Sequence, residues 1–410
     1  MRCALIGERL GHSYSKLIHD SFGLYSYELV SLPKEKLSDF MREGEFDAFN
    51  VTIPYKRDVM HYCSYISPEA EHIGSVNTVV RTPDGLHGFN TDYFGFKAMA
   101  DRAGISFKGK NIVILGSGGT SLTARAVAAD GGAEKICIVS RSGEYNYENL
   151  ERLADCDVLI NTTPVGMYPK NGASAVTLDS FPRCGAVLDV IYNPLRTELI
   201  LQAQERNIKC SGGLYMLVSQ AAQSAGYFCG AEIPQQKVEE VFRSLTLSVQ
   251  NIVLVGMPGC GKTTVARELA ALTGRRIADT DEMVEASAGM SIPEIFEKYG
   301  EQHFRKLESE AVCSAAKEKG LIISTGGGAV LREENVRALK GNGRIYHLQR
   351  SLDELALDGR PLSRDRAALK KMLGERSPIY ASCADTQIDN NLTPRQTAEK
   401  ILGEFESSRV

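Results

Sequence analysis

Residues 256–264, with the sequence GMPGCGKTT, form the feature that most constrains what this chain can fold into. An apolar run at 252–255 precedes them and predicts a buried strand that enters a glycine-rich loop. In such a loop, backbone N–H groups turn inward around phosphate, the lysine reaches the outer phosphates, and the following hydroxyl binds Mg²⁺. The loop therefore predicts a nucleoside triphosphate site formed by Gly259, Cys260, Gly261, Lys262, Thr263 and Thr264.

The loop begins only at residue 256 of 410, so the residues before it must form at least one further domain. The hydrophobic fraction is 43% and the formal net charge is -4, which offers no global basic field for nucleic acid or for an anionic membrane. The chain has no signal peptide and no apolar run near 18 residues, and its ten cysteines lie singly, as in reduced proteins. We expect a cytoplasmic monomer or homodimer with no nucleic-acid or membrane partner.

Short apolar strands alternate with amphipathic helices almost from end to end, a pattern typical of an α/β fold whose parallel sheets are covered by helices. The predicted strands are residues 3–6, 27–32, 48–53, 111–115, 135–139, 158–161, 186–191, 252–255, 321–324 and 344–348. Residues 243–249 contain neither Gly nor Pro and form the clearest boundary. This predicts a close junction rather than a long tether.

A second glycine-rich turn, of a different kind, follows the strand at 111–115. Its residues Gly116, Ser117, Gly118, Gly119 and Thr120 lead into a helix and fit a dinucleotide-binding turn, in which the helix N-terminus faces a pyrophosphate. The next strand ends in Ser140, Arg141 and Ser142. A basic residue at this position favours NADP, because it can bind the 2′-phosphate that NAD lacks.

Four polar segments before that turn read GHSYS (11–15), NVTIPYK (50–56), GSVNT (74–78) and GFNTD (88–92). Together with NTTPVGM (161–167), residues 189–194 and GLYMLVSQAA (213–222), they resemble shikimate dehydrogenase in order across residues 1 to about 245. The resemblance implies a two-lobed α/β unit. Residues 1–100 would bind substrate, completed by helices within 214–245, and residues 101–213 would form a Rossmann domain that binds NADP(H).

The same resemblance implies roles for individual residues. Lys56 and Asp92 would be catalytic and bracket the reacting carbon of 3-dehydroshikimate. Substrate would be held by Ser13, Ser15, Thr52, Lys56, Asn77, Asp92, Tyr192 and Gln220, and Ile191 and Gly213 would join the NADP site. The chain departs from the family at residues 225–230 and at Ser140, and it contains no Trp.

Residues 276–281 (RIADTD) predict a strand that ends in two carboxylates sharing one side of the chain. With GEQHFR (300–305), TGGGA (325–329), RPL (360–362) and RSPIY (376–380), this segment and the phosphate loop resemble shikimate kinase, in order, from about 249 to 405. The resemblance implies a P-loop kinase domain of the α/β/α type with a parallel sheet at 249–410.

The kinase resemblance implies that ATP and Mg²⁺ are used, with Lys262 on the phosphates and Thr263 and Asp279 on the metal. Asp281 would be catalytic and orient the attacking hydroxyl. Shikimate would be bound by Asp281, Arg305, Gly327, Gly328 and Arg376, and Arg360 would contact ATP from a lid. Residues 353–359, before Arg360, form a shorter lid than is usual and lack the additional basic residue often found there.

We therefore predict a bifunctional enzyme that reduces 3-dehydroshikimate to shikimate and then phosphorylates shikimate. Oxidation of quinate by the first half remains an alternative, as does a ligand-sensing regulator built from the same two domains. Because one product is the other's substrate, channelling is a further hypothesis, although nothing in the sequence makes the two clefts face each other.

Overall fold

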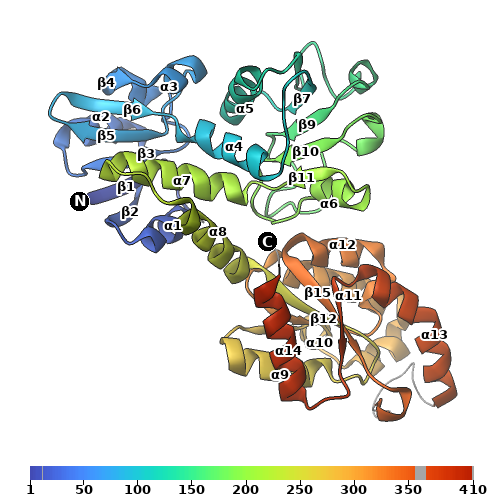
Figure 1. The fold of residues 1–410 in the computed structure, drawn as a ribbon. Coiled ribbons are helices and arrows are strands. Elements are labelled where there is room, and N and C mark those ends of the chain that lie inside the picture. Colours follow the sequence, from blue (N-terminus) through green and yellow to red (C-terminus); the bar gives the residue numbers. More distant parts are fainter. Residues whose placement is uncertain (12, 356–365, 409–410) are drawn as a thin grey trace. The chain divides into compact units, whose positions relative to one another are not determined.

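A computed structural model describes residues 1–11, 13–355 and 366–408 of the chain (Figure 1). The chain divides into two compact units. The first unit comprises residues 1–165, 174–192 and 202–245, and the second comprises residues 166–173, 193–201 and 246–410. Each unit contains its own cavity, so each is described separately.

The first sheet of the first unit has six strands in the order β2-β1-β3-β5-β6-β4. They are β1 (Arg2–Gly7), β2 (Ser26–Ser31), β3 (Ala48–Val51), β4 (Cys63–Ile66), β5 (Thr78–Thr82) and β6 (Gly85–Phe89). β1 pairs in parallel with β2 and β3, but β5 runs antiparallel to β3 and β6. The expectation of a wholly parallel sheet is wrong here, because Pro83 and Asp84 form a two-residue turn that folds β5 and β6 into a hairpin.

The second sheet of the first unit is wholly parallel, in the order β11-β10-β9-β7-β8. Its strands are β7 (Asn111–Leu115), β8 (Lys135–Val139), β9 (Val158–Asn161), β10 (Ala186–Asp189) and β11 (Lys209–Ser211). Isoleucine and valine side chains of β7 and β9 are buried against α5 (Gly119–Asp130), which follows the glycine-rich turn. This is the strand-turn-helix unit that the sequence predicts.

Two helices join these sheets. α4 (Thr91–Arg102) packs along α7 (Leu214–Cys229), and both run between the sheets in Figure 1. A Cβ on Gly95 would lie 2.6 Å from the carbonyl oxygen of Met216, so glycine permits this close approach. The packing brings the first turn of α4 beside the middle of α7, where the first cavity lies. The remaining helices of residues 1–249 are α1 (Ser15–Phe22), α2 (Leu37–Glu43), α3 (Pro68–Ile73), α6 (Glu198–Glu205) and α8 (Gln235–Val249).

The second unit contains a parallel five-stranded sheet in the order β13-β14-β12-β15-β16. Its strands are β12 (Asn251–Val255), β13 (Ile277–Asp279), β14 (Ile322–Ser324), β15 (Gly343–Gln349) and β16 (Thr386–Asp389). β12 is central and every one of its residues is buried, as its apolar run predicts. The phosphate loop therefore leaves the middle of the sheet.

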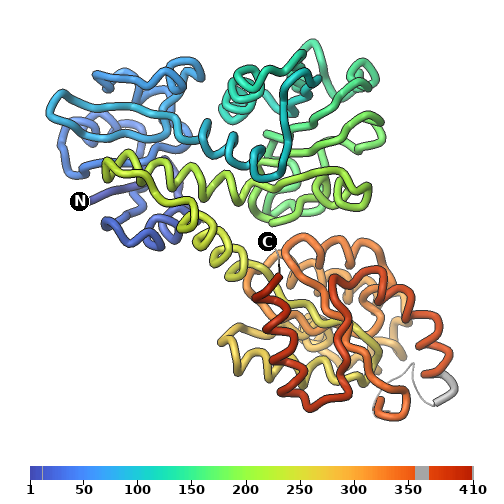
Figure 2. Tube along the Cα trace, viewed as in Figure 1, coloured from blue at the N-terminus to red at the C-terminus, as the bar shows by residue number. Residues whose placement is uncertain are grey.

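Helices surround this sheet along the yellow-to-red part of the trace in Figure 2. They are α9 (Lys262–Thr273), α10 (Thr280–Ala288), α11 (Ile292–Lys317), α12 (Glu333–Asn342), α13 (Arg366–Cys383) and α14 (Pro394–Ser407). α9 packs against α14, and α11 packs against α10 and α12. Gly300 interrupts α11 with φ 79° and ψ 173°, a kink that orients the turn carrying Arg305.

The predicted junction at 243–249 is helical. α8 continues through it to Val249, and β12 begins two residues later at Asn251. Short 3₁₀ helices occupy Lys34–Lys36, Asp58–Tyr62, Leu150–Leu153, Leu178–Ser180, Ala329–Leu331 and Leu352–Glu354. In the described ranges, no helix combines the length and the apolar character needed to cross a bilayer.

Candidate active sites

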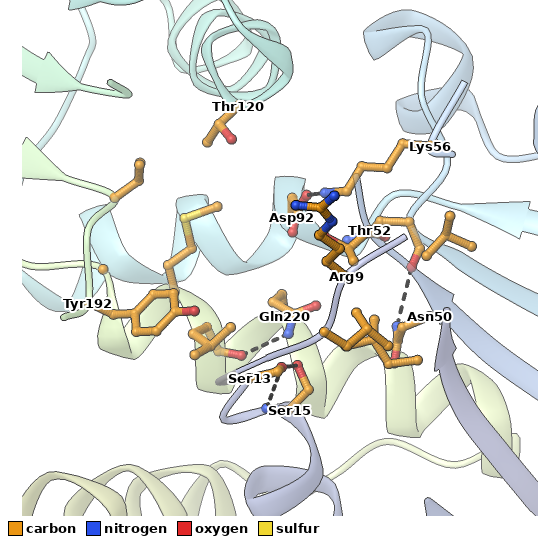
Figure 3. A pocket seen from close by; sticks show the side chains of 18 of the residues that line it. Arg9, Ser13, Ser15, Asn50, Thr52, Lys56, Asp92, Thr120, Tyr192 and Gln220 are labelled. Atoms are coloured by element: carbon orange, nitrogen blue, oxygen red, sulfur yellow. Dashed lines mark hydrogen bonds and ion pairs between the residues drawn. The ribbon is translucent and has the colours of Figure 1, made fainter. Parts of the chain in front are cut away.

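The first unit contains a cavity of about 400 Å³ between its two sheets. It is lined by every residue that the sequence assigns to the first substrate: Ser13, Ser15, Thr52, Lys56, Asn77, Asp92, Tyr192 and Gln220. Figure 3 labels seven of these side chains, all except Asn77, arranged around the cavity. Segments far apart in sequence thus form one polar pocket.

Lys56 and Asp92 form an ion pair on the wall of this cavity, with 2.5 Å between Nζ and Oδ2 (Figure 3). Their side chains are 28% and 17% exposed, so the pair is sheltered but open to a ligand. Asp92 lies in the first turn of α4, where the helix dipole stabilises a carboxylate. The pair places a proton donor and the group that fixes its position within reach of one bound molecule.

A buried hydrogen-bond network fixes the floor of the cavity. The Asn77 side-chain carbonyl accepts from the Thr91 backbone N–H at 2.7 Å, and the Thr91 hydroxyl lies 3.3 Å from Gln220 Oε1. The Gln220 amide donates to the Leu217 carbonyl at 2.9 Å. Because these partners leave little freedom of rotation, Asn77 and Gln220 present fixed amide groups to a ligand.

Hydroxyl groups of Ser13, Ser15 and Tyr192 also line the cavity. The Ser13 hydroxyl lies 2.9 Å from that of Ser15, and it accepts from the Ser15 backbone N–H at 3.1 Å. The Tyr192 ring lies 5.4 Å from that of Tyr14, and burial raises the pKa of the Tyr192 hydroxyl, which stays protonated and can donate. Such neutral donors suit a carboxylate or hydroxyl groups.

Two of the predicted dinucleotide residues, Thr120 and Gly213, line this cavity. A Cβ on Gly118 or Gly119 would meet no atom within 4 Å, so the start of α5 is open to a ligand. Ile191 is buried, whereas Arg141 and Ser142 are exposed beyond the end of β8. The remaining predicted residues, Gly116, Ser117 and Ser140, are not among the lining residues.

The second unit contains a cavity of about 510 Å³ around the phosphate loop. Gly259 and Gly261 have φ 81° and 92°, which only glycine adopts without strain. The Lys262 ammonium is buried and donates to the loop carbonyls of Gly256 (2.9 Å) and Met257 (3.0 Å). The loop therefore has the cradle and the cation that a polyphosphate requires.

Thr263 and Asp279 meet beside the loop. The Thr263 hydroxyl donates to Asp279 Oδ2 at 2.9 Å, and both residues line the cavity. Within the described ranges, no group of three or more His, Cys, Asp and Glu side chains is placed to hold a metal ion. One carboxylate with one hydroxyl nevertheless fits Mg²⁺, which keeps several waters and is completed by substrate phosphates.

The residues predicted to bind the phosphoryl acceptor also line this cavity. Arg305 pairs with Glu308 (2.7 Å) and Glu301 (3.0 Å), and its side chain is 11% exposed. Burial opposes its charge, but ion pairing with the two carboxylates leaves the pKa of Arg305 raised. Arg376 donates to the Gly327 carbonyl at 3.0 Å. Two guanidinium groups are thus held at one end of the cavity, an arrangement suited to a carboxylate.

Glycines make room for these charged groups. A Cβ on Gly328 would overlap Arg305 Nη1, and one on Gly326 would lie 2.5 Å from Asp281 Oδ1. In either case the charged end of the side chain would have to shift. The glycines of the TGGGA segment therefore leave room for Arg305 and Asp281 in their present positions beside the phosphate loop.

Two expectations need amendment, and a third concerns a residue outside the described ranges. Asp279 and Asp281 do not share one side of a strand, because Asp279 caps α10 by accepting from the Asp281 N–H at 3.0 Å and Asp281 lies in the first helical turn. Both still line the cavity. Cys260 is buried in the core and does not line it. Arg360 lies outside the described residues.

Sequence reasoning missed some lining residues, notably Arg9 in the first cavity and Glu285, Glu308 and Arg350 in the second. Glu308 follows Arg305 by three positions on α11, and this helical spacing of opposite charges could have indicated it. Arg9 and Arg350 lie outside the motifs on which the sequence predictions rest.

The fold is of the α/β class, and its two cavities are separate polar pockets, the second of them formed around a glycine-rich loop. Residues 5–79 match the family model described as the shikimate dehydrogenase substrate binding domain, and residues 258–406 match shikimate kinase. The NADP(+) shikimate dehydrogenase of Clostridium perfringens strain 13 is 34% identical over 264 residues, which cover 59% of this chain and 97% of that protein.

Solved structures give the same result for the first half. A chorismate mutase/shikimate 5-dehydrogenase fusion protein from Clostridium acetobutylicum is similar with a TM-score of 0.57 and 39% identity, over 60% of this chain and 96% of that one. Shikimate 5-dehydrogenase of Thermus thermophilus, in complex with NADP(H) and shikimate, is similar with a TM-score of 0.54 and 30% identity, over 60% and 99%. The chain belongs to the shikimate dehydrogenase family and also carries a shikimate kinase domain, so it is a bifunctional shikimate-pathway enzyme.

Proposed function

We propose that residues 1–245 reduce 3-dehydroshikimate to shikimate with NADPH, and that residues 249–410 transfer a phosphoryl group from ATP to the 3-hydroxyl of shikimate. The observation that carries the first reaction is the Lys56–Asp92 ion pair, which lies in one cavity with Ser13, Ser15 and Gln220. The second is supported by the shared cavity of Lys262, Asp281 and Arg305.

In the first reaction, bound NADPH supplies the hydride. Reducing a ketone leaves an oxygen that needs a proton, and the Lys56 ammonium is the donor placed to give it. Asp92 holds the ammonium in position. Ser13 and Ser15 would bind the substrate carboxylate, while Thr52, Asn77 and Gln220 would bind its hydroxyls and so fix which ring carbon lies beside Lys56.

In the second reaction, ATP supplies the phosphoryl group and Mg²⁺ would be held by Thr263 and Asp279. Arg305 and Arg376 would hold the shikimate carboxylate, and Asp281 would accept a hydrogen bond from the attacking hydroxyl and orient it. Lys262 neutralises charge on the phosphates. Positioning and charge neutralisation are the main demands of phosphoryl transfer, and these side chains meet both.

The substrate and cofactor of the first reaction can be tested by measuring kcat/KM for shikimate and for quinate, each with NADP and with NAD. We expect shikimate with NADP to be the best pair. A preference for quinate with NAD would contradict the proposal. Arg141→Asp should shift the preference toward NAD, because it removes the exposed cation beyond β8 that would bind the 2′-phosphate.

The second reaction is tested by measuring ADP formation from ATP and Mg²⁺ with and without shikimate. We expect ADP to form only when shikimate is present, and we expect EDTA to stop the reaction. ADP formation that does not depend on shikimate would contradict the assigned acceptor.

A further inference from the structure

Arg350 is a cation of the second cavity that neither the sequence motifs nor the comparisons assign. It follows the last residue of β15 and lines the cavity together with Lys262 and Thr263. Its Nη1 lies 3.4 Å from the position that a Cβ on Gly261 would occupy, so the guanidinium rests directly against the phosphate loop.

The loop that follows β16 holds Arg350 in this place. The Asn390 backbone N–H donates to the Gln349 carbonyl at 2.8 Å, and the Ser351 N–H donates to Asn391 Oδ1 at 3.1 Å. The buried Asn390 side chain in turn donates to the Cys260 carbonyl. The backbone on both sides of Arg350 is therefore fixed to the same loop that bonds the phosphate loop.

The guanidinium keeps its hydrogen-bonding capacity. In the described part of the chain its one ion pair is with Glu354, at 3.5 Å from Nε to Oε2, and buried Nε has no hydrogen-bond partner. The other cations of the cavity are engaged: Arg305 pairs with two carboxylates, and Lys262 and Arg376 donate to backbone carbonyls. A polyphosphate brings several negative charges, for which a fork of N–H donors is well suited.

We propose that Arg350 is a binding residue for the phosphate groups of the adenine nucleotide, acting from the end of β15 instead of from the lid. This inference rests on the proposed kinase activity and deepens it. It also gives a physical basis for a lid segment, residues 353–359, that lacks the additional basic residue. Arg350, at the end of β15 and beside the phosphate loop, would supply the cation that this segment lacks.

The test is calorimetric binding of ADP and of inorganic pyrophosphate to the full-length protein and to Arg350→Met. Arg276→Met is the matched control, because Arg276 is 78% exposed, pairs with Glu318 at 3.8 Å and does not line the cavity. Lys262→Met measures any background binding outside the phosphate loop. Thermal unfolding of each variant separates lost binding from lost folding.

We expect Arg350→Met to weaken ADP and pyrophosphate by a similar factor, roughly ten-fold, as the loss of a charge-assisted contact predicts. Arg350→Lys should recover part of the affinity for ADP, and Glu354→Gln should bind ADP equally well or more tightly. In Arg350→Met, KM for shikimate should stay within about two-fold of the unaltered value, because the substitution does not touch the shikimate site. Arg276→Met should bind like the unaltered protein.

Equal ADP affinity in Arg350→Met and the unaltered protein would overturn the inference. A loss for ADP without a loss for pyrophosphate would overturn it too, because the contact would then be with the base or ribose. A parallel loss of unfolding temperature in Arg350→Met and Glu354→Gln, with affinity unchanged, would make the pair purely structural. If the unaltered protein bound ADP but did not phosphorylate shikimate, the proposed kinase function would be wrong. The role of Arg350 in binding nucleotide phosphates would then still be decided by the affinity of Arg350→Met for ADP and pyrophosphate.

Discussion

The Lys56 ammonium and the Asp92 carboxylate meet at 2.5 Å in a cavity where both side chains remain partly exposed. An ion pair that served stability alone would gain nothing from facing a pocket of polar groups. Its position on the wall supports the proposed role of Lys56 as the proton donor of the reduction, which leads to the first prediction.

Lys56→Met should lower kcat/KM for reduction of 3-dehydroshikimate by about 100-fold or more, because positioned acid–base groups contribute factors of this size. NADPH oxidation measures the effect. Shikimate-dependent ADP formation by the same variant should be unchanged, which serves as its internal control. Simultaneous loss of both activities in a folded protein would contradict the assignment of Lys56 to one site.

Lys262→Met should have the reverse effect. The buried ammonium donates to the phosphate loop, and its removal should lower the rate of ADP formation by roughly 100-fold, as does loss of other fixed transition-state donors. NADPH oxidation with 3-dehydroshikimate should persist. If phosphorylation survived the substitution, the phosphate loop would not be the nucleotide site.

Gly328→Ala should disturb the carboxylate end of the kinase cavity. The new methyl group would overlap Arg305 Nη1, so the guanidinium must move away from its pairs with Glu301 and Glu308. KM for shikimate should rise about ten-fold, since hydrogen bonds to charged groups contribute about 1.5–3 kcal/mol.

The matched control is Gly403→Ala, because a Cβ at that position in α14 meets no atom within 4 Å. It should leave KM unchanged. Equal KM values for Gly328→Ala and Gly403→Ala would show that Arg305 does not bind the acceptor.

His19 makes the first unit sensitive to acid. Burial lowers its pKa from 6.5 to about 3, its Nδ1 lies 2.6 Å from the Tyr25 hydroxyl, and its ring stacks on Tyr27 at 3.9 Å. Since the unfolded state binds the proton more readily, stability from neutral His19 is complete above the unfolded pKa near 6.5 and falls as pH drops toward 3. We expect a loss on the order of 2–4 kcal/mol between pH 7 and pH 4.

Hydrogen exchange of peptides covering α1 and β2 at pH 7, 5 and 4, corrected for intrinsic rates, measures this loss locally. His19→Asn should be less protected at pH 7 and should change less with pH, whereas His72→Asn, at an exposed position, should behave as the unaltered chain does. Undiminished acid sensitivity in His19→Asn would assign the effect to other groups.

The strands that were easiest to predict from the sequence have nearly continuous apolar runs. β7 and β9 have the predicted bounds because they are largely buried on both faces of a parallel sheet. The missed strands β4, β11 and β16 each lie at a sheet edge, where one side is unpaired and polar residues such as Lys209 or Gln387 are tolerated. β5 and β6 were not predicted, because they form a hairpin and so break the expected alternation of strands and helices.

The site residues likewise divide into those that a sequence motif predicts and those that only the fold brings to a cavity. Residues within motifs, such as Lys56, Asp92 and Lys262, line the cavities because strand ends carry them there. Arg9 and Arg350 reach the cavities only through the path of the folded chain, and no local pattern distinguishes them from surface cations. The helical placement of Asp281 depends on the cap that Asp279 forms, which a strand interpretation could not foresee.

The central claim is that one chain makes shikimate at the first site and phosphorylates it at the second. The most direct measurement mixes the full-length protein with 3-dehydroshikimate, NADPH, ATP and Mg²⁺, and follows NADPH loss and ADP formation together. We predict that ADP formation starts after a lag, because it needs the shikimate that NADPH oxidation produces. At the end of the reaction, the amount of ADP formed should equal the amount of NADPH oxidised, mole for mole. NADPH consumption without ADP formation, or ADP formation without NADPH, would contradict the account.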